Sequence, residues 1–143
     1  MDVARILEGK GHQVMASPPT ASVAEVALRL KDAAIGAVVV QDGDGRIVGI
    51  LSERDVVHAL VEFDSDLPTQ PVAALMTREV QTCTPSDKVH EIMHQMTESR
   101  IRHLPVIDDG VLAGIISIGD IVKHRLEELE EESDALRDYI ASV

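Results

Sequence analysis

Two seven-residue blocks carry a glycine, a serine and an aspartate at the same spacing. They are residues 49–55 (GILSERD) and residues 114–120 (GIISIGD). In both blocks an apolar run precedes the serine and a helical pattern follows it, so the serine opens a helix. A helix N-terminus favours a phosphate, a serine hydroxyl can donate to one, and an ionised carboxylate offers two acceptor oxygens to the hydroxyls of a ribose. The residue types therefore indicate a nucleotide site, to which Gly49 and Gly114 would permit close backbone approach.

The same spacing also has a purely structural interpretation. A serine followed three residues later by an acidic residue is close to a capping box, which satisfies the unpaired N–H groups of a helix start. A second copy of the block does not decide between the two interpretations, because a repeat copies its caps as well. The residues alone therefore leave open a nucleotide-binding module and a ligand-free structural or oligomerisation module.

Both blocks belong to an internal repeat that organises the chain. Residues 14–42 align with residues 80–108 at an offset of 66, and residues 45–61 align with residues 110–126 at an offset of 65. Self-similarity of this kind marks a duplicated structural unit. Each unit has about 50 residues, too few for a comfortable core of its own, so we expect the two to pack against each other.

Periodicity predicts the same order of elements, β-α-β-β-α, in both units. Apolar residues recur at helical spacing in 23–30 and 89–96, and aspartate–glycine clusters at 42–45 and 108–110 predict hairpin turns. Runs rich in β-branched residues predict strands at 37–40, 47–51, 104–107 and 112–116. Second helices begin at Ser52 and Ser117, and residues 2–9 predict a short leading helix.

These elements predict an α+β fold of two β-α-β-β-α repeats with pseudo-twofold symmetry, flanked by N- and C-terminal helices. Two prolines and two aspartates between Asp64 and Pro71 indicate a linker. The predicted boundaries are an N-terminal helix at 1–13, a first repeat at 14–66, a linker at 67–79, a second repeat at 80–125 and an acidic C-terminal helix at 126–143.

A heptad-like stripe distinguishes the C-terminal segment from the repeat. Its members fall at alternating steps of four and three residues: Val122, Leu126, Leu129, Ser133, Leu136, Ile140 and Val143. The stripe fits a helix that packs on its own domain, and equally a helix that packs on a second subunit. Three heptads are too few to choose between them.

The repeat, the Gly-x-x-Ser-x-x-Asp blocks and the segment at 101–106 (IRHLPV) together resemble a tandem pair of CBS (cystathionine β-synthase) domains. The resemblance covers nearly the whole chain. It implies a stand-alone regulatory and signal-transduction module, not an enzyme, that binds adenosine-containing ligands such as AMP, ATP or NAD in the clefts between repeats. It also implies a homodimer with four repeats in a flat disc. Because allostery needs a second site or partner, the module would signal by conformational change to an unknown effector protein.

The resemblance also assigns roles to individual residues. Asp55 and Asp120 would take the ribose, and Ser52 and Ser117 the phosphate. Further phosphate contacts would come from Arg54, Arg102 and His103. The adenine would be lined by Ser17, Ile35 and Ala37 in one repeat and by Thr82, Ile101 and His103 in the other. Gly119 replaces Arg54, and Gly36-Ala37 replace Arg102-His103, so we expect the two sites to differ in charge and in ligand or affinity.

Residues 90–94 (HEIMH) match the H-E-x-x-H motif of zinc hydrolases. Two histidines one helical turn apart could hold a zinc ion, with Glu91 acting on its water. The longer motif fails, because Thr97 and Arg100 stand where a glycine and a third histidine belong. A zinc hydrolase is thus a remote alternative, and a solvated helix face that requires no metal is favoured.

Composition excludes several other classes. The chain has 13 Lys and Arg against 25 Asp and Glu, a net charge of −12, and only 1% aromatic residues. This balance repels nucleic-acid backbones and removes the stacking platforms of single-strand binders. Apolar runs such as 33–40 are much shorter than the roughly 20 residues of a membrane span, and no secretory signal is visible. Cys83 is the only cysteine, which excludes an internal disulfide and fits a cytoplasmic protein; we expect it partly buried and not nucleophilic.

Overall fold

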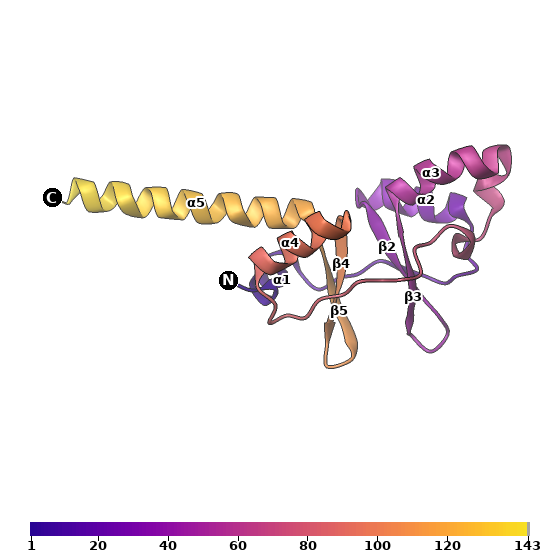
Figure 1. Ribbon diagram of the computed structural model, residues 1–143, viewed down its shortest axis with the longest axis horizontal. Helices are drawn as coiled ribbons and strands as arrows, with labels where there is room; N and C mark the ends of the chain where they lie inside the picture. Colours follow the sequence, from indigo (N-terminus) through magenta and orange to yellow (C-terminus); the bar gives the residue numbers. More distant parts are fainter. Residues whose placement is uncertain (143) are drawn as a thin grey trace. The chain divides into compact units, whose positions relative to one another are not determined.

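The computed structural model describes residues 1–142, which form a mixed α+β fold and confirm the predicted class (Figure 1). The chain divides into two compact units. Residues 13–81 form the first-repeat unit. The second-repeat unit consists of residues 1–12 together with the residues from 82 onward. Each unit has its own aliphatic core.

The first-repeat unit follows the predicted order β-α-β-β-α. Its elements are β1 (Ala16–Ser17), α2 (Val23–Ala33), β2 (Ala37–Gln41), β3 (Ile47–Ser52) and α3 (Glu53–Phe63). The sheet order is β1-β2-β3, with β1 parallel to β2 and β3 antiparallel to it. The Asp42 carboxylate accepts the N–H groups of Asp44 and Arg46 at 3.0 and 2.9 Å, which confirms the predicted hairpin turn.

The second repeat keeps only the last four elements of that order: α4 (Val89–Ser99), β4 (His103–Asp108), β5 (Val111–Ser117) and α5 (Ile118–Ala141). Its unit also contains the leading helix α1 (Val3–Lys10). A single parallel bridge between Cys83 and Val106 replaces the first strand. The reason lies in Pro105, which has no N–H to donate. The N–H of Val39, the matching residue of the first repeat, bonds the Met15 carbonyl at 3.1 Å and extends β1.

The segment predicted as a linker packs into the core of the first-repeat unit. It contains two 3₁₀ helices, η1 (Asp64–Thr69) and η2 (Val72–Ala74). Leu67, Val72 and Met76 are buried in the same cluster as the strands of that unit. The segment is therefore part of the core of this unit, because each 3₁₀ helix buries an apolar side chain there: Leu67 from η1 and Val72 from η2.

The predicted leading helix is confirmed as α1, and it packs on the second repeat, far from it in sequence. Val3, Ile6 and Leu7 are buried together with the residues of β4, β5 and α4. Residues 1–12 and 72–81 thus play matching parts, and we call them the two leader segments. Each precedes one repeat in the chain and packs on the other.

Gly49 and Gly114 make room for these leader segments. An added Cβ at Gly114 would lie 2.8 Å from the Leu7 side chain, and one at Gly49 would meet the Met76 side chain and the Thr77 carbonyl oxygen at 3.1 Å. Both glycines are buried. The expectation that they admit a ligand was wrong, because side chains of the protein fill the space beside them.

Helix α5 is continuous over its 24 residues, so the predicted boundary between 125 and 126 falls inside it. Its stripe is exposed: Val122 by 51%, Leu126 by 56%, Leu129 by 44%, Leu136 by 59% and Ile140 by 65%. The stripe therefore does not pack on its own unit, and Val143 lies outside the described residues. Within residues 1–142, neither α5 nor another helix is both long and apolar enough to cross a bilayer.

Replacing Gly49 by alanine tests the packing of the leader segments. The new methyl group must displace Met76 and the Thr77 backbone, so we expect a loss of about 1–3 kcal/mol in the free energy of unfolding. Gly43→Ala in the hairpin turn is the matched control, because its added Cβ meets nothing within 4 Å. Urea unfolding measures both variants, and equal effects would contradict the packing role of Gly49.

Candidate functional site

Each candidate site is a junction at which a strand runs directly into a helix. In the first, Ser52 caps α3: its hydroxyl accepts the N–H of Asp55 at 3.2 Å, and Asp55 Oδ2 accepts the N–H of Ser52 at 2.9 Å. In the second, Ser117 caps α5 through the same pair of bonds with Asp120, at 3.2 and 2.8 Å. The capping-box interpretation is therefore confirmed for both blocks.

The capping bonds leave Oδ1 of each aspartate able to accept hydrogen bonds from another partner. The bonds to the serine N–H groups engage only Oδ2 of Asp55 and of Asp120. A carboxylate can accept about four hydrogen bonds, and both side chains are only half-buried. One pair of residues can therefore cap the helix and bind a ligand hydroxyl as well.

The structure brings the start of the first hairpin strand, β2 or β4, to each junction. Ala37 pairs with Ser52, and the Gly36 carbonyl accepts the N–H of Glu53 at 2.9 Å. In the second-repeat unit His103 pairs with Ser117, and the Arg102 carbonyl accepts the N–H of Ile118 at 2.9 Å. The chain segments at 35–37 and 101–103, predicted from the resemblance, thus lie beside the helix starts.

The arginines differ between the two junctions. Arg54 is exposed one residue before Asp55, whereas Gly119 occupies the matching place before Asp120. Arg102 is exposed beside the second junction, and Gly36 stands in its place at the first. Each junction therefore carries one arginine, but on a different element.

Ser17, the predicted contact on the first strand, lies farther away. Ser17 is 2% exposed, pairs with Val40 rather than with Ala37, and donates its hydroxyl to the Pro18 carbonyl at 3.1 Å. Three residues of strand correspond to about 10 Å, so Ser17 is not part of the junction. Thr82 is exposed and directly precedes the Cys83 bridge, while Ile101 and His103 are half-buried.

Two residues at the junctions were not predicted, and both come from leader segments. Thr77 lies beside β3 and directs its hydroxyl toward Asp55 Oδ1 at 3.5 Å. Lys10, at the end of α1, donates to Asp120 Oδ2 at 2.6 Å and to the Ile115 carbonyl at 2.7 Å. Lys10 and Asp120 are 110 positions apart, and no local pattern in the sequence indicates their contact.

Lys10 sets the electrostatics of the second junction. Partial burial raises the pKa of the Asp120 carboxyl, but hydrogen bonds from Lys10 and Ser117 and the charge of Lys10 outweigh it and lower the pKa below its ordinary value. Asp120 is therefore firmly ionised at neutral pH. A ribose at this aspartate would share the carboxylate with Lys10, whereas at Asp55 it would share it with a neutral threonine.

The motif residues His90, Glu91 and His94 lie on exposed positions of α4. His94 pairs with Glu98 at 3.1 Å, and both side chains are more than two-thirds exposed. Among residues 1–142 no group of three or more His, Cys, Asp or Glu is placed to hold a metal ion. The zinc interpretation thus finds no third ligand in the part of the chain that the structure describes.

Cys83 is a core residue. It is 3% exposed, and burial, with the nearby charge of Asp87, raises the pKa of its thiol to about 12. A thiol of this kind is neutral and unreactive at physiological pH, which agrees with the expectation that it is not a nucleophile.

Comparison with known proteins identifies the repeat. The model of the CBS domain matches residues 11–62 and again residues 72–127. The chain belongs to the CBS domain family. The two matches make it a tandem CBS pair, as its sequence resemblance indicated, and a CBS pair is a regulatory module.

Solved CBS structures share this fold. The CBS-domain containing protein ATU1752 from Agrobacterium tumefaciens is 43% identical, with a TM-score of 0.85 over 87% of this chain and 92% of that one. The CBS domain protein PAE2072 from Pyrobaculum aerophilum, complexed with AMP, is 29% identical, with a TM-score of 0.74 over 84% and 89%. The CBS domain pair of protein MJ0100, in complex with 5′-methylthioadenosine and S-adenosyl-L-methionine, is 25% identical, with a TM-score of 0.79 over 90% and 98%.

Four curated relatives are longer than this CBS pair. The chain spans 65%, 52%, 42% and 63% of their lengths, at identities of 32% to 39%.

Lys10→Met should expose the electrostatic role of the α1–α5 contact. Because the folded-state pKa of Asp120 is lowered, its stabilising contribution is present above the unfolded pKa of about 3.9 and is lost as pH falls through the folded value. We expect the variant to lose about 0.5–1 kcal/mol of unfolding free energy at pH 7, a difference that shrinks below about pH 4.

Unfolding at a series of pH values measures this effect. Lys31→Met, at an exposed lysine of α2, is the matched control and should follow the wild type at every pH. A stability difference for Lys10→Met that does not change with pH would contradict an electrostatic role of the contact.

Proposed function

We propose that this CBS pair binds adenosine-containing ligands of the AMP, ATP and NAD class at its two Ser-x-x-Asp junctions. Binding changes the conformation of the pair, and a separate effector protein reads that change. No catalytic step is part of this proposal. On the ground that the sequence has a single cysteine, we place the module in the reducing cytoplasm.

The geometry of the two junctions carries the proposal. Each presents a helix N-terminus, a capping serine and a half-buried aspartate whose cap bonds engage only Oδ2. Such a group suits a ribose with a phosphate or another polar substituent nearby. The ligands named with PAE2072 and MJ0100 are AMP, 5′-methylthioadenosine and S-adenosyl-L-methionine, which share an adenosine group.

The two junctions are unequal, so we expect them to prefer different ligands or to differ in affinity. At the first junction, Arg54 lies in the first turn of α3, and Asp55 faces the neutral Thr77. At the second, Gly119 leaves the first turn of α5 without an arginine. Arg102 lies on the preceding segment, and Lys10 holds Asp120. An anionic phosphate would thus meet its positive partner from a different direction at each junction.

A ligand-free structural module is the second candidate function, and the complete capping boxes favour it. In that case Ser52, Asp55, Ser117 and Asp120 only stabilise helix starts. The two candidates differ in what happens when an aspartate loses its charge but keeps an acceptor oxygen for the cap.

Thermal unfolding in the presence of AMP, ADP, ATP, NAD and S-adenosyl-L-methionine distinguishes the two. A ligand at 100 times its dissociation constant stabilises by about 2.7 kcal/mol, or roughly 5–10 °C in Tm for a chain of this size. We expect a shift with at least one compound in the wild type. Asp55→Asn should remove the part of the Tm shift that comes from the first junction, and Asp120→Asn should remove the part from the second. The double variant should lose the whole shift.

Asp32→Asn, at an exposed position of α2, is the matched control and should keep the full shift. Each asparagine variant should unfold within about 1 kcal/mol of the wild type without ligand, because the amide oxygen still caps. The absence of any shift in the wild type, or an unchanged shift in the double variant, would contradict the proposal and leave the structural module.

A further inference from the structure

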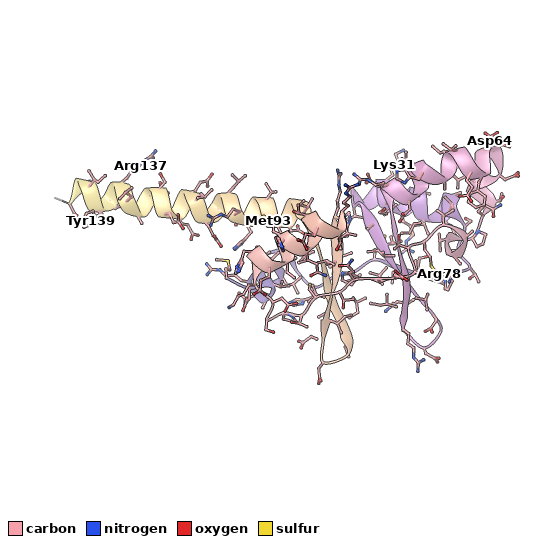
Figure 2. The ribbon with its side chains drawn as sticks, viewed as in Figure 1. Lys31, Asp64, Arg78, Met93, Arg137 and Tyr139 are labelled. Atoms are coloured by element: carbon pink, nitrogen blue, oxygen red, sulfur yellow. The ribbon has the colours of Figure 1, made fainter. Side chains whose placement is uncertain are left out.

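Helix α5 carries an apolar face that its own unit leaves uncovered. The helix extends past α1 and α4, and Arg137 and Tyr139 lie near its free end (Figures 1 and 2). We call this face the α5 stripe; it consists of Val122, Leu126, Leu129, Ser133, Leu136 and Ile140. The five apolar side chains of the α5 stripe are 44% to 65% exposed. An isolated helix is only marginally stable in water without packing of its apolar face, so this face needs a partner.

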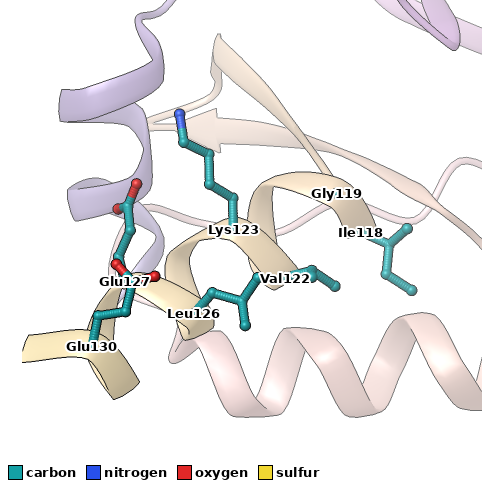
Figure 3. Close-up of a pocket in the computed structure, with 7 residues that line it drawn as sticks. All are labelled: Ile118, Gly119, Val122, Lys123, Leu126, Glu127 and Glu130. Carbon is teal, nitrogen blue, oxygen red and sulfur yellow. The ribbon is translucent and has the colours of Figure 1, made fainter. Parts of the chain in front are cut away.

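The near end of the stripe borders an open hollow. The hollow has a volume of about 580 Å³, and Val122 and Leu126 point to the same side of the helix within it (Figure 3). Its lining is Ile118, Gly119, Val122, Lys123, Leu126, Glu127 and Glu130, all from α5 itself. The hollow therefore marks an uncovered helix flank, and it contains neither Ser117 nor Asp120.

The alternating steps of the α5 stripe fix a heptad register. Leu126, Ser133 and Ile140 take position a, and Val122, Leu129 and Leu136 take position d. The flanking positions then carry both charges: Arg125 and Glu132 at g, and Lys123, Glu130 and Arg137 at e. The excess acidic residues lie at the outer positions b, c and f: Glu127, Glu128, Glu131, Asp134 and Asp138.

We propose that the α5 helices of two copies of this chain form a parallel, in-register, two-stranded coiled coil. In that arrangement each g residue faces the e residue five positions later on the other helix. Arg125 then meets Glu130 of the second copy, and Glu132 meets Arg137 of the second copy. Both pairs are of opposite charge, and the twofold symmetry of a dimer repeats each of them.

The antiparallel alternative at full overlap brings like charges together. There e faces e and g faces g, so Lys123 would meet Arg137 of the second copy, and Glu130 and Glu132 would each meet their own copies. Polar Ser133 would also face Leu129 of the second copy instead of another serine hydroxyl. Charge and polarity thus favour the parallel orientation.

The bonds within a single α5 are compatible with this pairing. Arg125 donates to Glu128 at 2.8 Å, and His124 shares the same carboxylate at 2.8 Å. Glu128 occupies position c, outside the seam. A guanidinium has five N–H donors, so Arg125 can keep this bond and still reach Glu130 of the second copy.

Cysteine cross-linking of the full-length chain tests the register and the orientation. Ser133→Cys and, near the end of the stripe, Ile140→Cys each place two thiols opposite each other if the helices are parallel and in register. In the antiparallel pair the two Ser133 positions are only four residues of helix apart, whereas the two Ile140 positions are 18 residues apart. Ala135→Cys, a small neutral residue at outer position c, is the matched control. The native Cys83 is 3% exposed and stays out of the reaction.

Under mild oxidation we expect Ser133→Cys to form covalent dimer on the order of tenfold faster than Ala135→Cys, because the pairing raises the effective thiol concentration. Equal rates for Ser133→Cys and Ala135→Cys would overturn the proposal and leave a different protein as the occupant of the stripe. Fast cross-linking of Ser133→Cys together with slow cross-linking of Ile140→Cys would overturn it in favour of an antiparallel pair.

Charge reversal within the Ser133→Cys background tests the ion pairs. Arg137→Glu should slow cross-linking several-fold, because it places two carboxylates opposite each other at the seam. Adding Glu132→Arg should restore the rate. Adding Glu131→Arg instead gives the same net charge but acts at outer position f, so it should not restore the rate. Equal rescue by both second changes would overturn the proposed pairing, and none of these outcomes depends on nucleotide binding.

Discussion

Leu7 and Met76 lie against the second strand of each hairpin, over positions where only glycine leaves enough room. The rest of the structure depends on this packing. A hairpin with two helices has too little apolar surface to bury for a stable core, and the leader segments supply what is missing. They bring Val3, Ile6 and Leu7 to one core and Val72 and Met76 to the other.

The same packing completes the two candidate sites. Once α1 lies across β5, its last residue, Lys10, reaches Asp120; once residues 72–77 lie across β3, Thr77 reaches Asp55. The cores and the sites are therefore built by the same contacts. The two junctions have the same backbone arrangement, and the leader segments give one a cation and the other a hydroxyl. The two candidate sites thus differ in charge although their capping motifs are the same.

At these junctions the capping bonds would not compete with the proposed ligand binding. The cap occupies Oδ2 of each aspartate and fixes the carboxylate at the helix start, which holds the side chain in one orientation before a ligand arrives. A site of this kind loses little conformational entropy on binding. Helix α5 connects the second junction to the proposed dimer seam, because Asp120 and the α5 stripe belong to one continuous helix. A ligand that moves the start of α5 would therefore act on the pairing of two copies.

The sequence by itself determined the local structure and the family. Hydrophobic periodicity and turn residues were sufficient to predict the strands, the hairpins and the start of each helix at Ser52 and Ser117, because these features depend on neighbours within a few positions. The CBS resemblance then predicted the candidate residues. Of these, the segments at 35–37 and 101–103 lie at the junctions, whereas Ser17 does not. The loss of the first strand of the second repeat also has a local cause, the missing N–H of Pro105, although the prediction overlooked it.

Only the tertiary structure decided what the leader segments do. It showed that the stretch at 67–79 is packed, that Gly49 and Gly114 face side chains, and that Lys10 and Thr77 contact the aspartates of the candidate sites. It also showed that the α5 stripe is left exposed by its own unit. The physical reason is the same in each case. These contacts join residues that are not neighbours in the chain. Their partners are selected by the shape and area of surfaces that exist only after the repeat that carries them has folded.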